Sequence, residues 1–123
     1  MAEKTIVLAE DETHIARLIM FKLEREGYKV DWAQNGGEAL SKIKSSPPDL
    51  ILLDVMMPVM DGYEVLKQIK EDGALKTIPI IMLSAKGQTA DIEKGSSLGA
   101  DDYIIKPFRP AELVERIKGI LKE

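Results

Sequence analysis

Residues 50–54 read Leu-Ile-Leu-Leu-Asp, an unbroken apolar run that ends in a carboxylate. A run of this length and composition is typical of a strand buried on both faces of a parallel sheet. Because an ionised group is costly to bury unless it is paired or solvated, the aspartate is expected to reach an edge of the sheet. The run therefore predicts a central strand that presents Asp54 there.

Three further apolar runs also end in a polar side chain. In chain order they deliver Glu10 and Asp11 after residues 6–9, Ser84 after residues 80–83, and Lys106 after residues 103–105. The carboxyl ends of parallel strands share one edge, and ligands of open α/β sheets bind at that edge. Three acids, a hydroxyl and an amine in one place predict a site for a divalent cation and a phosphoryl group.

Short apolar runs alternate with longer amphipathic stretches along the whole chain. Strands are expected at residues 5–10, 29–33, 50–54, 79–83 and 102–106, and helices at residues 12–27, 35–46, 62–72, 89–98 and 109–122. Strict alternation of this kind predicts a parallel sheet with helices on both faces. The stretch 29–33 alternates polar with apolar residues, which makes it a candidate edge strand.

Local signals mark the ends of several of these helices. Gly27 is placed to end the first helix, and Asn35 is placed to cap the second. Asp61-Gly62 is interpreted as a turn in which the glycine supplies an unusual φ angle.

Length and composition exclude several classes of protein. The chain of 123 residues predicts one domain, over residues 1–123, and its net charge of −4 argues against nucleic-acid binding. The absence of cysteine excludes disulfides and thiolate metal sites. No apolar stretch approaches the roughly 20 residues of a membrane span, and the N-terminus lacks the apolar stretch of a signal peptide. A cytoplasmic location without membrane contacts is therefore expected.

The three acids at the predicted edge favour a hard cation. Glu10, Asp11 and Asp54 would repel one another at close range, and Mg²⁺, or alternatively Mn²⁺, would remove that repulsion through oxygen ligands. Carboxylates also serve as covalent nucleophiles in phosphoryl transfer. Phosphorylation of Asp54 would add negative charge, which Lys106 and Ser84 could offset by donating hydrogen bonds.

Four segments, in order and at the expected spacing, resemble the receiver domain of two-component response regulators, the chemotaxis-regulator-like family. They are Ala9-Glu10-Asp11-Glu12, residues 53–62 from Leu53 to Gly62, Leu83-Ser84-Ala85, and residues 99–108 from Gly99 to Phe108. The resemblance covers essentially the whole chain. It implies an α/β fold, a flavodoxin-like three-layer αβα sandwich whose doubly wound, five-stranded parallel sheet has the order 2-1-3-4-5 and carries five helices.

The resemblance also implies a role for each polar residue at the edge. Asp54 would be the phosphoacceptor, Lys106 and Ser84 would take part in the phosphoryl chemistry, and Ser84 and Tyr103 would act as the switch. The peptide bond between Lys106 and Pro107 would be cis, a form that proline makes accessible.

The metal ligands follow from the same resemblance. Glu10, Asp11 and Asp54 would bind Mg²⁺ with their carboxylates, and the backbone carbonyl of Met56 would be a further ligand. No other cofactor is implied.

The function that the resemblance implies is a phosphorylation-activated switch in a phosphorelay. A sensor histidine kinase or a histidine phosphotransfer protein would phosphorylate the chain. The surface formed by the fourth helix, fifth strand and fifth helix would then change and regulate a downstream target protein or a fused effector domain. Such a protein catalyses only its own phosphotransfer and autodephosphorylation, so it is not an enzyme in the usual sense.

Oligomeric state is open at this stage: the chain would be a monomer at rest and could dimerise when phosphorylated. Asp102, Glu112 and Arg116 lie where receivers that dimerise through their fourth and fifth helices form cross-dimer ion pairs. Ile92 and Ser97, however, stand where charged partners would be expected.

Four alternatives to a stand-alone switch stay open. The chain could be the receiver fragment of a longer DNA-binding response regulator, or a degenerate receiver used only for protein contacts, against which its full set of polar residues argues. An aspartyl-nucleophile phosphohydrolase would need a second acid two residues after Asp54, where this chain has Met56. A flavin-binding domain would need a phosphate loop rich in small residues after the first strand, where this chain has acids.

Overall fold

Five parallel strands form the middle layer of the computed structural model, which describes residues 3–85 and 99–123. The strands are β1 (Thr5–Ala9), β2 (Lys29–Ala33), β3 (Leu50–Asp54), β4 (Ile80–Ala85) and β5 (Asp102–Lys106). The described part of the chain also contains the helices α1 (Thr13–Arg25), α2 (Gly36–Ser45) and α3 (Gly62–Glu71), each between two strands, and α5 (Pro110–Leu121), which follows β5. The helix expected at residues 89–98 lies outside the described residues.

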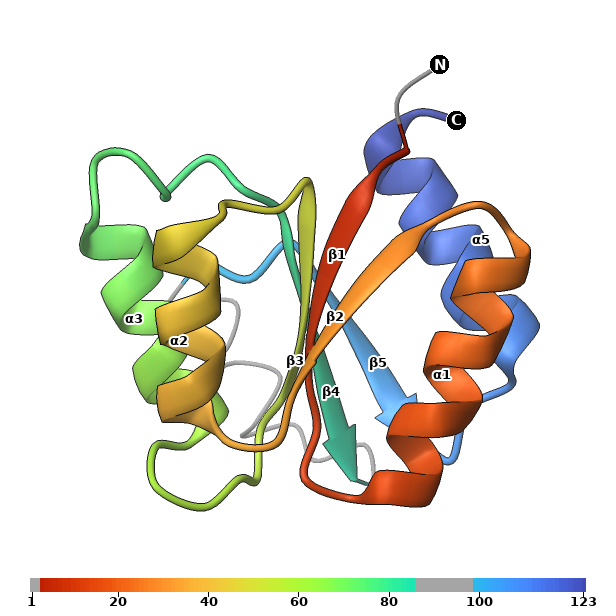
Figure 1. Ribbon diagram of the computed structural model, residues 1–123, viewed down its shortest axis with the longest axis horizontal. Helices are drawn as coiled ribbons and strands as arrows, with labels where there is room; N and C mark the ends of the chain where they lie inside the picture. The colour runs from red at the N-terminus through yellow and green to blue at the C-terminus, as the bar shows by residue number, and fades with distance from the viewer. Residues whose placement is uncertain (1–2, 86–98) are drawn as a thin grey trace.

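The sheet has the order β2-β1-β3-β4-β5, and every neighbouring pair is parallel. Helices α1 and α5 cover one face and helices α2 and α3 cover the other (Figure 1). The expected αβα sandwich and its strand order are therefore confirmed, and β2 is an edge strand as its alternating pattern predicted. No helix among the described residues is long and apolar enough to cross a membrane.

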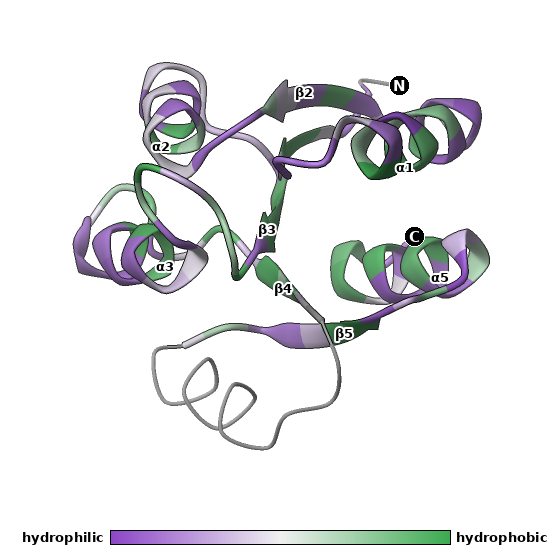
Figure 2. Ribbon diagram, turned by 90° about the horizontal axis from the view of Figure 1, so that it is seen from below, coloured by the Kyte–Doolittle hydropathy of each residue, from purple (hydrophilic) through white to green (hydrophobic). Residues whose placement is uncertain are grey.

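The core consists of two apolar clusters, one on each face of the sheet. All five residues of β3 are buried, and successive side chains point to opposite faces. Leu50 and Leu52 pack with residues of α1 and α5, whereas Ile51 and Leu53 pack with residues of α2 and α3. Each fully buried side chain of this size contributes roughly 1.5–3 kcal/mol. Figure 2 shows the corresponding pattern in the helices, whose hydrophobic residues face the sheet.

Capping side chains and glycines fix where the helices begin and end. The Asn35 side chain accepts a hydrogen bond from the Glu38 amide at 2.8 Å, which confirms the predicted cap of α2. Asp61 caps α3 in the same way, through the Glu64 amide at 3.0 Å. Gly27, just after α1, has a φ of +96° that a residue with a side chain rarely adopts.

The expectation of an unusual φ at Gly62 is wrong, because this glycine is required by a close contact instead. Gly62 is not among the positive-φ residues, but a Cβ atom there would lie 2.2 Å from the carbonyl oxygen of Asp54. Gly36 makes a similar contact, because its Cβ would lie 1.9 Å from the carbonyl oxygen of Met60. The end of β3 and the loop that follows it are thus in close backbone contact with the first residues of α2 and α3. Within that loop Val59 has a φ of +71°, a strained value for a β-branched residue.

We expect Gly36→Ala to lower the free energy of unfolding by about 1–3 kcal/mol, because its methyl group would push against backbone atoms. Gly119→Ala is the matched control, since Gly119 lies within α5 and a Cβ there meets no atom within 4 Å. That variant should be unchanged or more stable by up to about 1 kcal/mol. Urea unfolding followed by circular dichroism measures both, and equal stability of the two variants would contradict the contact at Gly36.

Candidate functional site

The carboxyl ends of β1, β3 and β5 bring together the two buried acids and the lysine singled out from the sequence. Lys106 Nζ donates to Glu10 Oε1 at 2.9 Å and to Asp54 Oδ2 at 2.7 Å. Alternation along the strands explains the meeting. Side chains two residues apart in a strand point to the same face of the sheet. The residues two positions before Glu10, Asp54 and Lys106 all belong to the apolar cluster under α1 and α5; they are Leu8, Leu52 and Ile104.

These groups are almost completely buried. Glu10 is 0% exposed and Asp54 is 4% exposed, and the side chain of Lys106 is 15% exposed. The second oxygen of each acid accepts a main-chain hydrogen bond: Glu10 Oε2 from the amide of Glu12 and Asp54 Oδ1 from the amide of Met56, each at 3.2 Å. Every oxygen of the two buried carboxylates thus has a donor, as buried charged groups require.

Two acids and one amine leave an excess of negative charge. Burial, together with the neighbouring Asp54, raises the pKa of Glu10 to about 7 even though Lys106 opposes that shift. Burial by itself lowers the pKa of Lys106, but its hydrogen bonds to Asp54 and Glu10 outweigh that effect and hold the pKa above its ordinary value. Lys106 is therefore charged, while Glu10 takes up a proton near neutral pH.

A divalent cation fits this group of oxygens. Asp11 is exposed beside the buried pair, and one carboxylate oxygen from each of Glu10, Asp11 and Asp54 lies within 4.8 Å of the others. The site offers hard oxygen donors, which suit Mg²⁺ and Mn²⁺. Burial, together with the neighbouring Asp54, disfavours the ionised form of Glu10 and so raises its pKa, and a dication would favour that form. The carbonyl of Met56 as a further ligand stays a prediction.

The two residues predicted to act as the switch lie on the neighbouring strands β4 and β5. Ser84 is 1% exposed and follows Leu83, the residue of β4 that is paired with Asp54 in the sheet. Tyr103 is half-buried in β5 and packs against the apolar cluster under α2 and α3. Its hydroxyl lies 3.1 Å from the hydroxyl of Tyr63, at the start of α3. Their roles as a switch stay predictions.

Two contacts at the site were not foreseen from the sequence. One is the hydrogen bond between Tyr63 and Tyr103; the other is a hydrogen bond of 2.8 Å from the indole Nε1 of Trp32 to the carbonyl oxygen of Glu10. Each joins residues at least 22 positions apart, and nothing in the local sequence marks either pair.

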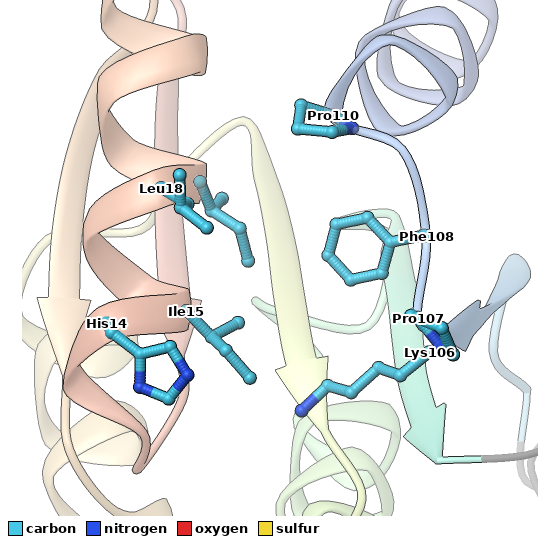
Figure 3. A pocket seen from close by; sticks show the side chains of 8 residues that line it. His14, Ile15, Leu18, Lys106, Pro107, Phe108 and Pro110 are labelled. Carbon is cyan, nitrogen blue, oxygen red and sulfur yellow. The ribbon is translucent and has the colours of Figure 1, made fainter.

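An apolar groove of about 540 Å³ runs along the face of α1 next to the acid cluster. Ile15 and Leu18 of α1 line one side, Phe108 and Pro110 line the other, and the aliphatic part of Lys106 lies at one end (Figure 3). The peptide bond between Lys106 and Pro107 is cis, as predicted.

Comparison with known proteins supports a single family. The family model of the response regulator receiver domain matches residues 6–118. The chain is 50% identical over 120 residues to the transcriptional regulatory protein ResD of Bacillus subtilis, covering 98% of this chain and 49% of ResD. It is 45% identical over 122 residues to the phosphate regulon regulator PhoB of Pseudomonas aeruginosa, covering 99% of this chain and 53% of PhoB. The chain therefore spans about half the length of these curated relatives.

Solved structures agree with this result. The chemotaxis protein CheY4 of Vibrio cholerae superposes with a TM-score of 0.91 at 31% identity, covering 97% of this chain and 99% of that one. A CheY-like receiver domain protein of Methanospirillum hungatei superposes with a TM-score of 0.92 at 33% identity, covering 98% of this chain and 95% of that one.

Without metal, the free energy of unfolding should fall as the pH rises from about 4.5 to 7, because ionised Glu10 is disfavoured only in the folded state. We expect Glu10→Gln to remove this fall, which we put at roughly 1–3 kcal/mol. Glu24→Gln, which alters an exposed glutamate of α1, is the control and should keep the wild-type profile. Urea unfolding in EDTA across this pH range tests the prediction, and parallel profiles for all three proteins would contradict it.

Proposed function

The chain belongs to the family of response regulator receiver domains, and we propose on that basis that it is a phosphorylation-activated switch whose phosphoacceptor is Asp54. The observation that carries the proposal is the buried Asp54 carboxylate, held by Lys106 at 2.7 Å beside two further acids. A buried acid with a purely structural role would need only one charged partner. Asp54 has such a partner in Lys106 and also lies next to further acids that could bind a cation. The proposal treats residues 1–123 as one receiver domain of a two-component system in the cytoplasm.

The proposed reaction is transfer of a phosphoryl group from a phosphohistidine of the donor protein. An oxygen of Asp54 forms the new bond to phosphorus while the P–N bond breaks, and its electron pair stays on the imidazole nitrogen. Mg²⁺, or Mn²⁺, held by Glu10, Asp11, Asp54 and the carbonyl of Met56, would neutralise charge on the phosphoryl oxygens. The ammonium group of Lys106 is already in contact with Asp54, so it can donate to the same oxygens.

The proposed switch is a rearrangement around the new phosphoryl group. Ser84 lies one residue beyond the position paired with Asp54, so a small movement of the end of β4 could bring its hydroxyl to the phosphoryl oxygens. Tyr103 would then change its packing, and its hydrogen bond to Tyr63 would have to break or re-form. Such new contacts favour one of two states only to the extent that they differ between the states.

A phosphohydrolase is disfavoured by the residue two positions after Asp54. An aspartyl phosphohydrolase would need an acid there to protonate the leaving group. Met56 has no ionisable group, and it is 73% exposed. The proposed chemistry is therefore limited to the chain's own phosphorylation and dephosphorylation.

The groove along α1 supports docking of a phosphodonor protein, either a sensor histidine kinase or a histidine phosphotransfer protein. Lys106 lines the groove and also contacts Asp54, so a partner seated there would lie beside the phosphoacceptor. Leu18, which lines this groove, is 59% exposed, and Phe21, three residues further along α1, is 62% exposed. We therefore propose that the phosphodonor protein docks on the α1 side of the molecule and not on the side of α2 and α3.

We propose that the phosphorylated chain regulates either a separate target protein or a fused effector domain. The names of the relatives ResD and PhoB identify transcriptional regulators, and this chain corresponds to about half of each. Any DNA binding would then belong to the other half. A dimer in the phosphorylated form is also proposed, but Arg116 already pairs with Asp102 of its own chain at 2.8 Å and 2.9 Å. A cross-dimer pair would have to share or replace that contact.

We expect the wild-type protein to gain one phosphoryl group when it is incubated with acetyl phosphate and Mg²⁺. The Asp54→Asn variant should not be phosphorylated at a rate comparable to that of the wild type. Asp49→Asn is the matched control, because Asp49 immediately precedes β3 and bonds Thr5 at the other end of the sheet. Intact-protein mass spectrometry measures all three proteins. Equal phosphorylation of Asp54→Asn and wild type would reject Asp54 as the acceptor.

Leu18→Asp should slow phosphotransfer from a phosphorylated histidine phosphotransfer protein by about tenfold or more, because a charge would be buried at the centre of the contact. The same variant should react with acetyl phosphate at the wild-type rate, since the small donor needs no groove. Ser41→Asp, an exposed position of α2 on the opposite face of the sheet, is the control. If phosphotransfer to Leu18→Asp were as fast as phosphotransfer to Ser41→Asp, docking of the donor in this groove would be contradicted.

A further inference from the structure

The indole of Trp32 reaches across from β2 to the main chain of Glu10. Trp32 is the only tryptophan of the chain. It is half-buried, packs against the apolar cluster under α1 and α5, and is paired with Leu8 in the sheet. Its Nε1 donates to the carbonyl oxygen of Glu10 at 2.8 Å, a good hydrogen-bond length.

This bond occurs just where the regular pairing of β1 and β2 ends. The last paired residues are Ala9 and Ala33, and the amide of Glu10 makes one further bond to the carbonyl of Ala33 at 3.0 Å. The carbonyl of Glu10 lies beyond the last paired residues and accepts the indole N–H of Trp32. Both main-chain polar groups of Glu10 are therefore held by β2.

The carbonyl held by Trp32 belongs to the peptide bond that joins Glu10 to Asp11. The side chain of Glu10 is fixed by burial and by Lys106, whereas Asp11 is exposed, so the direction of its carboxylate depends on the main chain that carries it. Rotation of this peptide plane would change the spacing between the two carboxylates. A contact that fixes the plane therefore fixes how the two acids face a shared cation.

We propose that Trp32 is a positioning residue for the cation site, acting through the hydrogen bond from its indole N–H to the Glu10 carbonyl. The inference rests on the proposed function, because it takes Glu10 and Asp11 as ligands of a divalent cation. Groups that orient metal ligands in this way commonly change metal affinity when they are removed, by about 10- to 100-fold. Because Asp11 keeps its own carboxylate in this case, the lower end of that range is expected.

The test compares cation affinity in two variants of Trp32 with a matched control. Trp32→Phe keeps an aromatic ring but removes the donor, and replacement of Trp32 by benzothienylalanine keeps the ring shape and replaces only the N–H group with sulfur. Tyr28→Phe is the control, because it removes an aromatic donor to Glu123 at the other end of the sheet. Binding of Mn²⁺, measured from the electron paramagnetic resonance signal of the free ion, gives the dissociation constants.

Both Trp32 variants should bind Mn²⁺ about tenfold more weakly than wild type, and Tyr28→Phe should bind it normally. Urea unfolding in EDTA checks that all proteins are folded. Wild-type affinity in both Trp32 variants would overturn the inference. Wild-type affinity in the benzothienylalanine protein alone would also overturn it, because ring packing and not the hydrogen bond would then be responsible.

A second measurement reads the hydrogen bond itself. The single indole N–H gives one cross-peak in a ¹H–¹⁵N spectrum, and this peak should shift during a Mg²⁺ titration with the same midpoint as Mg²⁺ binding measured by calorimetry. A peak that does not move would overturn the coupling. Failure of the proposed function is distinct: wild type would then bind no Mn²⁺, or Asp11→Asn would bind it as tightly as wild type.

Discussion

The contact on which the site depends is the bridge that Lys106 forms between Glu10 and Asp54. Two buried carboxylates a few ångströms apart would repel each other strongly, and removing one partner of a buried charged pair is far more costly than breaking an exposed one. The lysine contacts both acids, but burial and the neighbouring Asp54 still raise the pKa of Glu10. A divalent cation bound by these oxygens would favour the ionised form of Glu10. A phosphoryl group added to Asp54 would meet an amine that is already in place.

Strand alternation directs the polar residues of the candidate site to two different faces of the sheet. Glu10, Asp54 and Lys106 have the parity that faces α1 and α5, where the apolar groove and the indole of Trp32 also lie. Ser84 and Tyr103 have the opposite parity, and Tyr103 reaches Tyr63 of α3. In the function proposed above, donor docking and cation binding thus belong to one face, and the response to phosphorylation begins on the other.

Close backbone contacts hold the loop that follows Asp54. Gly36 and Gly62 let the carbonyls of Met60 and Asp54 approach the first turns of α2 and α3, where any side chain would collide. The loop accepts a strained φ at Val59 in this arrangement. The amide of Met56, in the same loop, donates to Asp54. The geometry at Asp54 is consequently coupled to the first turns of α2 and α3.

The sequence alone determined the fold class, the strand order through its family resemblance, and the set of polar residues at the sheet edge, because apolar periodicity and strand ends are local properties of the chain. It also indicated the Asn35 cap, the cis bond before Pro107 and the edge position of β2. It did not determine the reason for Gly62, the partner of Tyr103, or the contact of Trp32 with Glu10. Those depend on atoms from distant segments that approach only after the layers have packed, and packing distances, unlike periodicity, leave no pattern within a single stretch of sequence.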